Sequence, residues 1–497
     1  MSLKKRRLEK PIMYHPTLEE FRELKKQGNL VPVYRQIDAN AHTPLAAYLK
    51  VNGGGYSFLL ESVEGGQEKA GYSLIGTEPY RVLSTREGDK TDPLRLVAEE
   101  LAKHRLAPVS GLPDFGGGAV GYLAYETVRR LEELPSPNAD PLALPESVFM
   151  FVDSLLIFDH ANNKIKVVSH ARTDGDSAYQ AAVAKIENLV KKLEAPPERS
   201  QPARTVHRPA RPAETVSNLT REEFEAVVAK ARKYIVAGEA IQIVLSQRLS
   251  RRTSARPLDI YKALRGINPS PYMFFLDLKD FQLIGSSPEI LVRAVNGKVT
   301  TRPLAGTRPR GKTPEEDAEL EKELRSDEKE RAEHIMLVDL GRNDIGRVSL
   351  PGTVRVSELM EVERYSHVMH LVTNVEGKLR PELSPIDALK SCFPAGTVSG
   401  APKIRAMEII AELEPDKRGP YAGCVGYFSF SGNMDTAITI RTIVMTKGTA
   451  YVQAGAGIVY DSLPAREYEE TLNKARALLK AIEQAETMEM SHAATDR

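Results

Sequence analysis

Residues 423–460, GCVGYFSFSGNMDTAITIRTIVMTKGTAYVQAGAGIVY, contain the pattern that decides the fold class. Three runs rich in β-branched and aromatic residues, at roughly 423–430, 436–446 and 450–460, favour strands. The three strands follow one another directly, and a helix over 463–485 comes next. This order is not the regular strand–helix alternation of a parallel sheet. The stretch therefore predicts a layered α+β fold with much antiparallel sheet.

The start of this stretch has a counterpart in the first half of the chain. Gly118-Ala119-Val120-Gly121-Tyr122 repeats the pattern of Gly423-Cys424-Val425-Gly426-Tyr427. Glycine inside a strand marks a bend or a close approach of another backbone. We therefore expect two similar positions in the sheets, and the repeat needs no chemical role.

Local signals place several other elements. Thr17 with Glu20, and Thr220 with Glu223, form capping boxes that open helices. Asn296-Gly297 lies between two short apolar runs and predicts a hairpin. A single strand is expected over Ser147 to Phe158.

A proline-rich segment divides the chain near its middle. Five prolines and four arginines interrupt residues 196–217. Proline at this density stops helices and central strands, so we expect an extended linker, with a basic docking peptide as the alternative. The predicted division is an N-terminal domain over 1–195, the linker over 196–217, a second domain over 218–486 and a flexible tail over 487–497.

Charge and composition exclude several classes of protein. The 497 residues include 68 Lys and Arg against 67 Asp and Glu, a net charge of +1, which excludes a nucleic-acid binder that relies on bulk positive charge. No apolar run reaches the roughly 18 residues of a membrane span, and the first residues do not resemble a signal peptide. Only two cysteines occur, Cys392 and Cys424, which favours a reducing compartment. We therefore expect a soluble, cytoplasmic protein.

Two of the predicted helices carry pairs of acidic residues one turn apart. Glu330 and Glu333 share a face of one helix, and Glu467 and Glu470 share a face of the last helix. Carboxylates in this arrangement can hold a hard cation such as Mg²⁺. On either helix alone a solvated acidic face is the simpler interpretation, and Glu470 is also well placed for an ion pair with Lys474.

Small residues gather in two further segments. The segment FPAGTVSGAPK, residues 393–403, could cradle an anion with its backbone N–H groups, although it lacks the spacing of a P-loop. The segment AGAGIV, residues 454–459, lacks the third glycine of a dinucleotide motif. It fits close strand packing and carboxylate binding equally well.

Two polar residues lie inside predicted strands. Gln242 lies on the face opposite Ile241 and Ile243, so it either lines a cavity or is a core glutamine with satisfied partners. His370 is by default a structural histidine.

As an ordered set, these motifs resemble those of the chorismate-utilising enzymes. That family includes anthranilate synthase, aminodeoxychorismate synthase, and isochorismate and salicylate synthases. The resemblance is dense over roughly 220–485, and its segments are 333–344, 397–403, 423–427, 454–459 and 467–474. It implies a large antiparallel β-sheet sandwich with surrounding helices, in which 218–486 is the chorismate-binding catalytic domain and 1–195 includes a regulatory segment.

Three places indicate a branch of the family. Gln242 stands where water-activating members carry a lysine that serves as general base. Ala305 stands where many aminodeoxychorismate synthases carry a lysine nucleophile. Leu59–Ser62 and Asn268–Met273 resemble the tryptophan feedback site of anthranilate synthase large subunits. The resemblance therefore implies the branch of the anthranilate synthase large subunits, or component I. The alternatives are aminodeoxychorismate synthase component I and a non-catalytic amino-acid sensor.

The resemblance also implies an activity and a set of site residues. The activity is that of a Mg²⁺-dependent lyase, which converts chorismate and ammonia to anthranilate and pyruvate through aminodeoxyisochorismate, in tryptophan biosynthesis. The implied metal ligands are Glu333 and Glu470, supported by Glu330 and Glu467. Implied substrate contacts are Tyr427, Arg441, Gly455, Ala456, Gly457, Lys474, Gly306 and Thr307. Implied catalytic residues are Glu289 as general acid, His370, Gln242 and Thr397.

Partners follow from the same resemblance. A glutamine amidotransferase subunit, component II, supplies ammonia, and the two components form a heterotetramer. Tryptophan is the expected feedback inhibitor. Its implied contacts are Glu61, Ser62, Pro271, Tyr272 and Met273.

Overall fold

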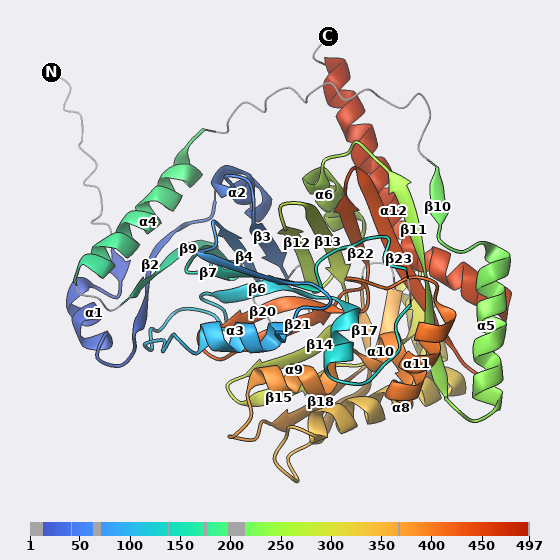
Figure 1. Ribbon diagram of the computed structural model, residues 1–497. Helices are drawn as coiled ribbons and strands as arrows, with labels where there is room; N and C mark the ends of the chain where they lie inside the picture. The colour runs from blue at the N-terminus through green and yellow to red at the C-terminus, as the bar shows by residue number, and fades with distance from the viewer. Residues whose placement is uncertain are drawn as a thin grey trace.

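Two large antiparallel sheets stacked face to face, with helices on their outer surfaces, make up the fold (Figure 1). The computed structural model describes residues 13–40, 42–62, 71–137, 139–172, 176–196, 214–365 and 368–495. The predicted α+β class and the antiparallel sandwich are therefore confirmed. No helix of these ranges is long and apolar enough to cross a membrane.

The helices and strands have the following bounds. The helices are α1 (Leu18–Leu24), α2 (Pro44–Val51), α3 (Pro93–Leu101), the 3-10 helix η1 (Tyr125–Arg130), α4 (Asp176–Glu194), α5 (Arg221–Val236), α6 (Pro257–Ile267), α7 (Pro314–Ser326), α8 (Glu328–Gly346), α9 (Pro385–Cys392), α10 (Gly396–Ser399), α11 (Lys403–Leu413) and α12 (Pro464–Thr495). The strands of the first half are β1 (Tyr14–His15), β2 (Leu30–Asp38), β3 (Ser57–Glu61), β4 (Tyr72–Thr77), β5 (Arg81–Thr85), β6 (Gly118–Leu123), β7 (Ser147–Val152), β8 (Ser154–Asp159) and β9 (Lys164–Arg172). Those of the second half are β10 (Thr215–Ser217), β11 (Gln242–Arg252), β12 (Tyr272–Asp277), β13 (Phe281–Ser287), β14 (Ile290–Val295), β15 (Lys298–Thr301), β16 (Leu304–Pro309), β17 (Arg355–Arg364), β18 (Val368–Lys378), β19 (Gly400–Ala401), β20 (Cys424–Ser429), β21 (Met434–Ile438), β22 (Thr442–Thr446) and β23 (Thr449–Ile458).

Both sheets contain strands from both halves of the chain. The first has the order β1-β2-β9-β8-β4-β3-β12-β13-β22-β23-β11-β10, with β19 paired to β11. The second has the order β16-β18-β15-β14-β21-β20-β6-β7-β5, with β17 paired to β18. The halves join where β3 pairs with β12 and where β6 pairs with β20.

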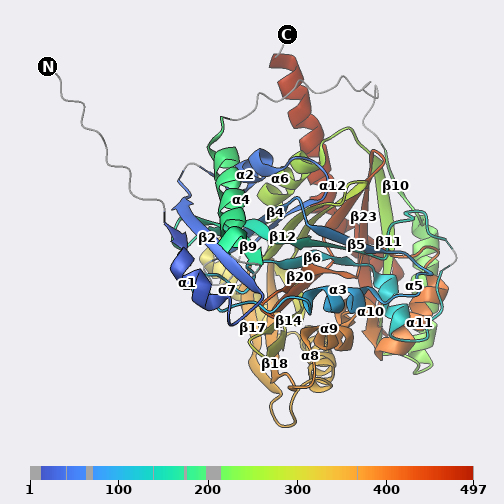
Figure 2. The same ribbon diagram turned by 60° about the vertical axis from the view of Figure 1, so that its left-hand side comes forward.

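Apolar side chains form three layers around these sheets. Residues such as Phe58, Tyr122 and Phe274 fill the space between the sheets. The outer face of the first sheet packs against α2, α4, α6 and α12, and the second packs against α3, α8 and α9. Figure 2 shows α4 and α6 on one side of the strands and α8 and α9 on the other.

The two copies of the glycine repeat pair with each other. Strands β6 and β20 run antiparallel, and Gly121 lies directly opposite Gly426. A Cβ on Gly121 would lie 1.9 Å from the carbonyl oxygen of Val148, and one on Gly426 would lie 2.2 Å from that of Asp435. The glycines are therefore explained by close backbone approach, as expected.

Several predicted elements differ from the structure. The expected strand Ser147–Phe158 is two strands, β7 and β8, which belong to different sheets. The run at 436–446 likewise divides into β21 and β22, and Arg441 adopts a φ of 50° at the break. An apolar run conceals such a change of sheet, because both strands are buried.

The predicted boundaries also need revision. Helix α12 continues to Thr495, past residue 486, because 487–495 contain neither glycine nor proline. At the end of the predicted linker, residues 215–217 form β10 and pair with β11. Residues 197–213 of that linker lie outside the described residues, and the division into domains stays a prediction.

We expect Gly121→Ala to destabilise the fold. The added methyl group must displace the backbone of β7, and overpacking of this kind costs about 1–3 kcal/mol. Urea unfolding measures the change. Gly266→Ala in α6 is the matched control, because a Cβ there meets nothing within 4 Å, and equal stability of the two variants would contradict the explanation.

Candidate functional site

The predicted metal ligands come from α8 and α12. Burial raises the pKa of Glu333, and the negative charges of Glu330 and Glu470 raise it further. Burial also raises the pKa of Glu467, with Glu470 again acting in the same direction. Glu333 thus interacts with Glu330 on its own helix and with Glu470 on α12, and Glu470 interacts with Glu467.

Two of these carboxylates have cationic partners. Arg308 donates to Glu330 at 3.1 Å, and Lys474 pairs with Glu470 at 2.6 Å. Among the described residues, no three or more His, Cys, Asp or Glu side chains are grouped as a metal site. Mg²⁺ usually takes only one or two protein carboxylates and completes its shell with water and substrate. Glu333 and Glu470, whose repulsion a cation would relieve, fit that requirement.

Gln242 connects β11 to this acidic group. Its Nε2 donates to Glu333 at 2.9 Å, while its Oε1 is buried without a hydrogen-bond partner. A Cβ on Gly457 would lie 2.6 Å from the same Nε2, so the amide packs directly on β23. Gln242 and the buried Ile243 lie on opposite faces of β11, as predicted, but Ile241, predicted to share the face of Ile243, precedes the strand and is exposed. An unpartnered amide oxygen is what a ligand could use.

Cationic and small residues continue the site along β23 and α12. Lys474 donates from Nζ to the carbonyl of Gly455 at 3.0 Å, and Arg441 donates to the carbonyl of Lys474 at 2.8 Å. Burial lowers the pKa of Arg441, and the charge of Glu470 opposes that shift. The segment Gly455–Gly457 therefore lies beside the charge of Lys474, and Arg441 binds the backbone of that lysine. Two cationic side chains at this end of the site suit a carboxylate.

Glu289 lies at the junction of β13 and β14 and lines an open cavity. Burial raises its pKa to about 8, although the charge of Lys474 lowers it. Thr397 of α10 lines the same cavity and also lowers this pKa, but its hydroxyl is buried and does not reach hydrogen-bond geometry with any described residue. A protonated carboxyl and an unpartnered hydroxyl therefore face one cavity.

His370 lies nearby on β18. Its Nδ1 is 2.9 Å from the carbonyl oxygen of Gly306 and 3.1 Å from the Thr307 hydroxyl on β16. Burial lowers the pKa of His370 to about 4, and the charges of Arg441 and Lys474 act in the same direction. The ring is thus neutral near pH 7 and lies within electrostatic range of the cationic residues.

One predicted substrate residue lies elsewhere. Tyr427 packs against Phe115, with ring centroids 4.6 Å apart and the rings tilted by 39°. Burial raises its pKa, the charge of Asp435 raises it further and that of Arg293 lowers it. The sequence analysis missed Tyr421, whose hydroxyl lies 2.7 Å from the position of a Cβ on Gly455. Burial raises the pKa of Tyr421 to about 12, and the charge of Arg441 opposes that shift. Tyr421 and Tyr427 lie on either side of the motif Gly423–Gly426, and the sequence offered no signal to choose between them.

Known proteins match the chain along most of its length. Residues 55–480 match the chorismate binding enzyme family. Anthranilate synthase component 1 of Acetivibrio thermocellus is 49% identical over 490 residues, which is 95% of this chain and 99% of that protein. The corresponding protein of Pseudomonas aeruginosa is 48% identical over 487 residues, 94% and 99% of the two chains.

The chain belongs to the anthranilate synthase component 1 group of the chorismate binding enzymes.

Solved structures agree with this membership. The crystal structure of anthranilate synthase component I from Streptococcus pneumoniae superposes with a TM-score of 0.75 and 40% identity, over 89% of this chain and 98% of the other. The isochorismate synthase MenF of Escherichia coli shares the fold, with a TM-score of 0.67 over 94% and 98% of the two chains, at 20% identity. The family predicted from the motifs is therefore confirmed.

The segments predicted to bind tryptophan are also brought together. Glu61 on β3 lies directly opposite Met273 on β12, although they are distant in sequence. The Glu61 carboxylate is buried and accepts from Tyr261 at 2.5 Å and from Arg265 at 3.2 Å. Tyr272 donates to Asp435 at 3.0 Å. Ser62 is exposed and Pro271 is half-buried, and the inhibitor role of all five residues stays a prediction.

We expect Glu289→Gln to change how stability depends on pH. The folded parent keeps the Glu289 proton up to about pH 8, whereas the unfolded chain loses it near 4.5. The folded state therefore binds more protons in this range, and the parent loses stability relative to the variant as pH rises through it. Urea unfolding of both proteins at pH 5, 7 and 9 measures this, and parallel curves would contradict the shift.

Proposed function

We propose that this chain is the chorismate-converting component of an anthranilate synthase. The reaction consumes chorismate and ammonia and releases anthranilate, pyruvate and water. The observation that carries the proposal is the position of Gln242, whose amide faces the Glu333 carboxylate where a base for water would otherwise stand. The identity of the curated relatives supports the same activity.

Glu289 is the proposed general acid. With a pKa of about 8 it holds a proton near neutral pH, and it can transfer that proton to the hydroxyl that leaves the ring. Thr397, with its unpartnered hydroxyl in the same cavity, can hydrogen-bond to the departing oxygen. A carboxyl with an ordinary pKa would be ionised and could not serve as the acid.

The substrate carboxylates are bound at opposite ends of the site. Arg441, Lys474 and the backbone of Gly455–Gly457 hold the enolpyruvyl carboxylate, with Tyr421 beside them. Glu333 and Glu470 would hold Mg²⁺, which when bound neutralises the ring carboxylate, and Glu330 and Glu467 support them. His370, neutral and fixed by Gly306 and Thr307, assists the elimination of pyruvate.

The choice of ammonia over water rests on the absence of a base. A glutamine amide cannot accept a proton near neutral pH, whereas ammonia is already a nucleophile and needs no such base. Ala305 on β16 is buried and offers no amine that could attack the ring. These residues disfavour isochorismate formation and the route of aminodeoxychorismate synthase.

The remaining proposals concern partners and setting. A glutamine amidotransferase subunit supplies the ammonia, and the two components assemble as a heterotetramer in the cytoplasm. Tryptophan binds beside the paired ends of β3 and β12, at Glu61 and Met273, and inhibits the enzyme. The relatives' designation as component 1 supports a second component.

Product analysis tests the proposed function. The purified chain is supplied with chorismate, Mg²⁺ and ammonium at alkaline pH, and the products are separated by chromatography. Fluorescent anthranilate is the expected product. Aminodeoxychorismate would instead identify the folate branch, and the absence of turnover would identify a sensor.

We expect Glu333→Gln and Glu470→Gln each to abolish Mg²⁺-dependent turnover while leaving the fold intact. Loss of one charge weakens both the metal and the carboxylate that the metal orients. Initial rates across a Mg²⁺ titration measure the effect. Glu469→Gln is the matched control on α12, because Glu469 pairs with Arg221 on the surface. Near-normal rates at low Mg²⁺ in either site variant would refute the assignment.

We expect tryptophan to inhibit the parent and Ser62→Arg to relieve that inhibition. The arginine occupies the edge of the pocket beside Glu61, so the inhibitor loses its site while the catalytic residues are untouched. A coupling of about 1–3 kcal/mol would change chorismate affinity roughly 5- to 150-fold. Anthranilate formation is titrated with tryptophan for both proteins. Equal inhibition of the two, or no inhibition of the parent, would show that the site lies elsewhere or is absent.

A further inference from the structure

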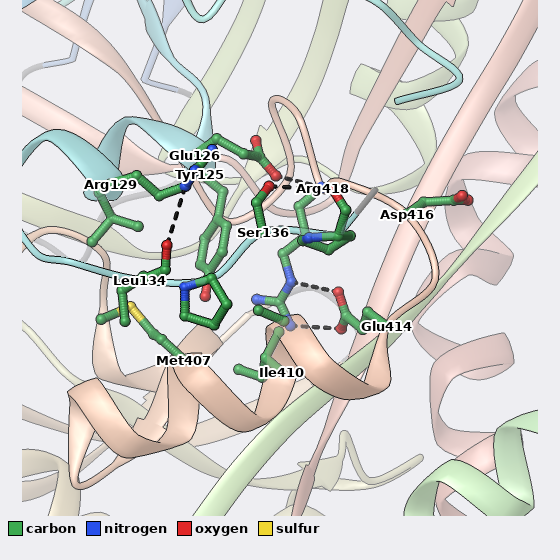
Figure 3. A pocket seen from close by; sticks show the side chains of 14 residues that line it. Tyr125, Glu126, Arg129, Leu134, Ser136, Met407, Ile410, Glu414, Asp416 and Arg418 are labelled. Carbon is green, nitrogen blue, oxygen red and sulfur yellow. Dashed lines mark hydrogen bonds and ion pairs between the residues drawn. The ribbon is translucent and has the colours of Figure 1, made fainter. Parts of the chain in front are cut away.

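Arg418 is the largest fully buried side chain among the described residues, and all three nitrogens of its guanidinium donate hydrogen bonds. Nε and Nη2 donate to the Glu414 carboxylate at 2.8 and 2.7 Å. Nη1 donates to the carbonyl of Val398 at 2.7 Å, and Nη2 also donates to the carbonyl of Val244 at 2.8 Å. Figure 3 shows the side chains of Arg418 and Glu414 facing each other in the lining of a pocket.

The backbone partners of Arg418 adjoin the proposed catalytic residues. Val398 directly follows Thr397 on α10. Val244 lies two residues beyond Gln242 on β11, and therefore on the same face of that strand. One guanidinium thus holds the segment 393–403, which contains α10 (the Thr397 loop), against β11, the strand that carries Gln242.

Glu414 extends the same connection to β23. Its Oε1 accepts from the backbone N–H of Ser246 at 2.8 Å and from the Ser246 hydroxyl at 2.9 Å. Ser246 lies opposite Gly455 in the β11–β23 pairing, and Gln453 donates to its hydroxyl at 2.9 Å. The ion pair therefore also reaches the strand that carries the proposed carboxylate-binding glycines.

The first half of the chain holds Arg418 from the other side. Glu126 of η1 accepts from the backbone N–H of Arg418 at 2.7 Å and from that of Gly419 at 3.0 Å. The guanidinium lies over the ring of Tyr125, 4.6 Å from its centroid, as Figure 3 also shows. Segments from both halves of the chain therefore fix the position of one arginine.

A buried ion pair is weak evidence for stability, because apolar side chains of similar volume often stabilise a core equally well. The contacts to Val398 and Val244 offer a different reason for this pair. We propose that Arg418, paired with Glu414, is a positioning residue that holds the Thr397 loop at the correct distance from Gln242 and Glu289. This inference rests on the proposed function, because it assigns the arginine to the geometry of that active site.

The double variant Arg418→Met with Glu414→Gln tests the proposal. It removes both charges, and the glutamine oxygen can still accept from Ser246. We expect kcat to fall about 10- to 100-fold, the usual consequence of a displacement of about 1 Å in an active site. KM for chorismate and the urea unfolding midpoint should stay close to those of the parent, since Arg441 and Lys474 are untouched.

The pH profile gives a readout that a merely structural role would not move. The Thr397 hydroxyl lowers the pKa of Glu289. Displacement of the loop should therefore shift the alkaline limb of kcat/KM to higher pH. Arg248→Met with Asp416→Asn is the matched control. It removes an ion pair between β11 and the segment after α11, in which Arg248 is buried and Asp416 is half-buried. Arg248 donates to Asp416 and to the Lys417 carbonyl, not to Val398.

Two results would overturn the proposal. One is an Arg418 and Glu414 double variant with the kcat and pH profile of the parent. The other is a control pair that loses as much kcat as the test pair, which would show a general effect of removing buried charge. Failure of the proposed function gives a different result, because the parent itself would then form no anthranilate.

Discussion

The antiparallel pairing of β11 with β23 is the interaction on which the rest of the candidate site depends. It runs from the pair Ile243–Ile458 to the pair Arg252–Thr449 without interruption. Because β23 leads directly into α12, the register of this ladder fixes where Glu470 and Lys474 lie relative to Gln242. The glycines at 455 and 457 let side chains from β11 and from Tyr421 reach the strand surface. A one-residue slip would turn Gln242 away from Glu333 and into the apolar layer.

The site holds ionisable groups in surroundings that disfavour their charged forms. Glu289 is buried and retains its proton, and Glu333 faces other acids. Such groups cost stability and persist only where the surrounding structure determines their position. Two large sheets built from both halves of the chain supply that structure. The same reasoning applies to Arg418, because an apolar side chain of similar volume would suffice if the position served stability alone.

The sequence predicted the features that short patterns determine. Both capping boxes are present in the structure, and the turn at Asn296-Gly297 joins β14 to β15 as expected. Helical spacing placed two acids on one face of α8 and two on one face of α12, and in the structure Glu333 and Glu470 interact electrostatically across the two helices. These features depend on residues a few positions apart, or on a motif that the family shares.

Features that depend on distant contacts could not be predicted. The alternation along β7 and β8 does not reveal that the chain changes sheets between them, since both strands are buried. Tyr421 and Tyr427 lie on either side of the motif Gly423–Gly426, and only the three-dimensional arrangement shows that Tyr421 reaches Gly455. The spacing of Glu414 and Arg418 indicates only a local ion pair, whereas the other partners of Arg418, at 126, 244 and 398, come from three separate segments that the sequence does not connect.

The account's central claim is that residue 242 faces the incoming nucleophile and that its amide excludes water from that role. Mass spectrometry of the products of Gln242→Lys, made from chorismate, Mg²⁺ and ¹⁵N-ammonium in H₂¹⁸O, tests this most directly. A lysine in this buried position can lose its proton and act as a base for water. We expect ¹⁵N-anthranilate alone from the parent and ¹⁸O-labelled isochorismate or salicylate from the variant. Unchanged rates and ¹⁵N-anthranilate alone from the variant would contradict the assignment.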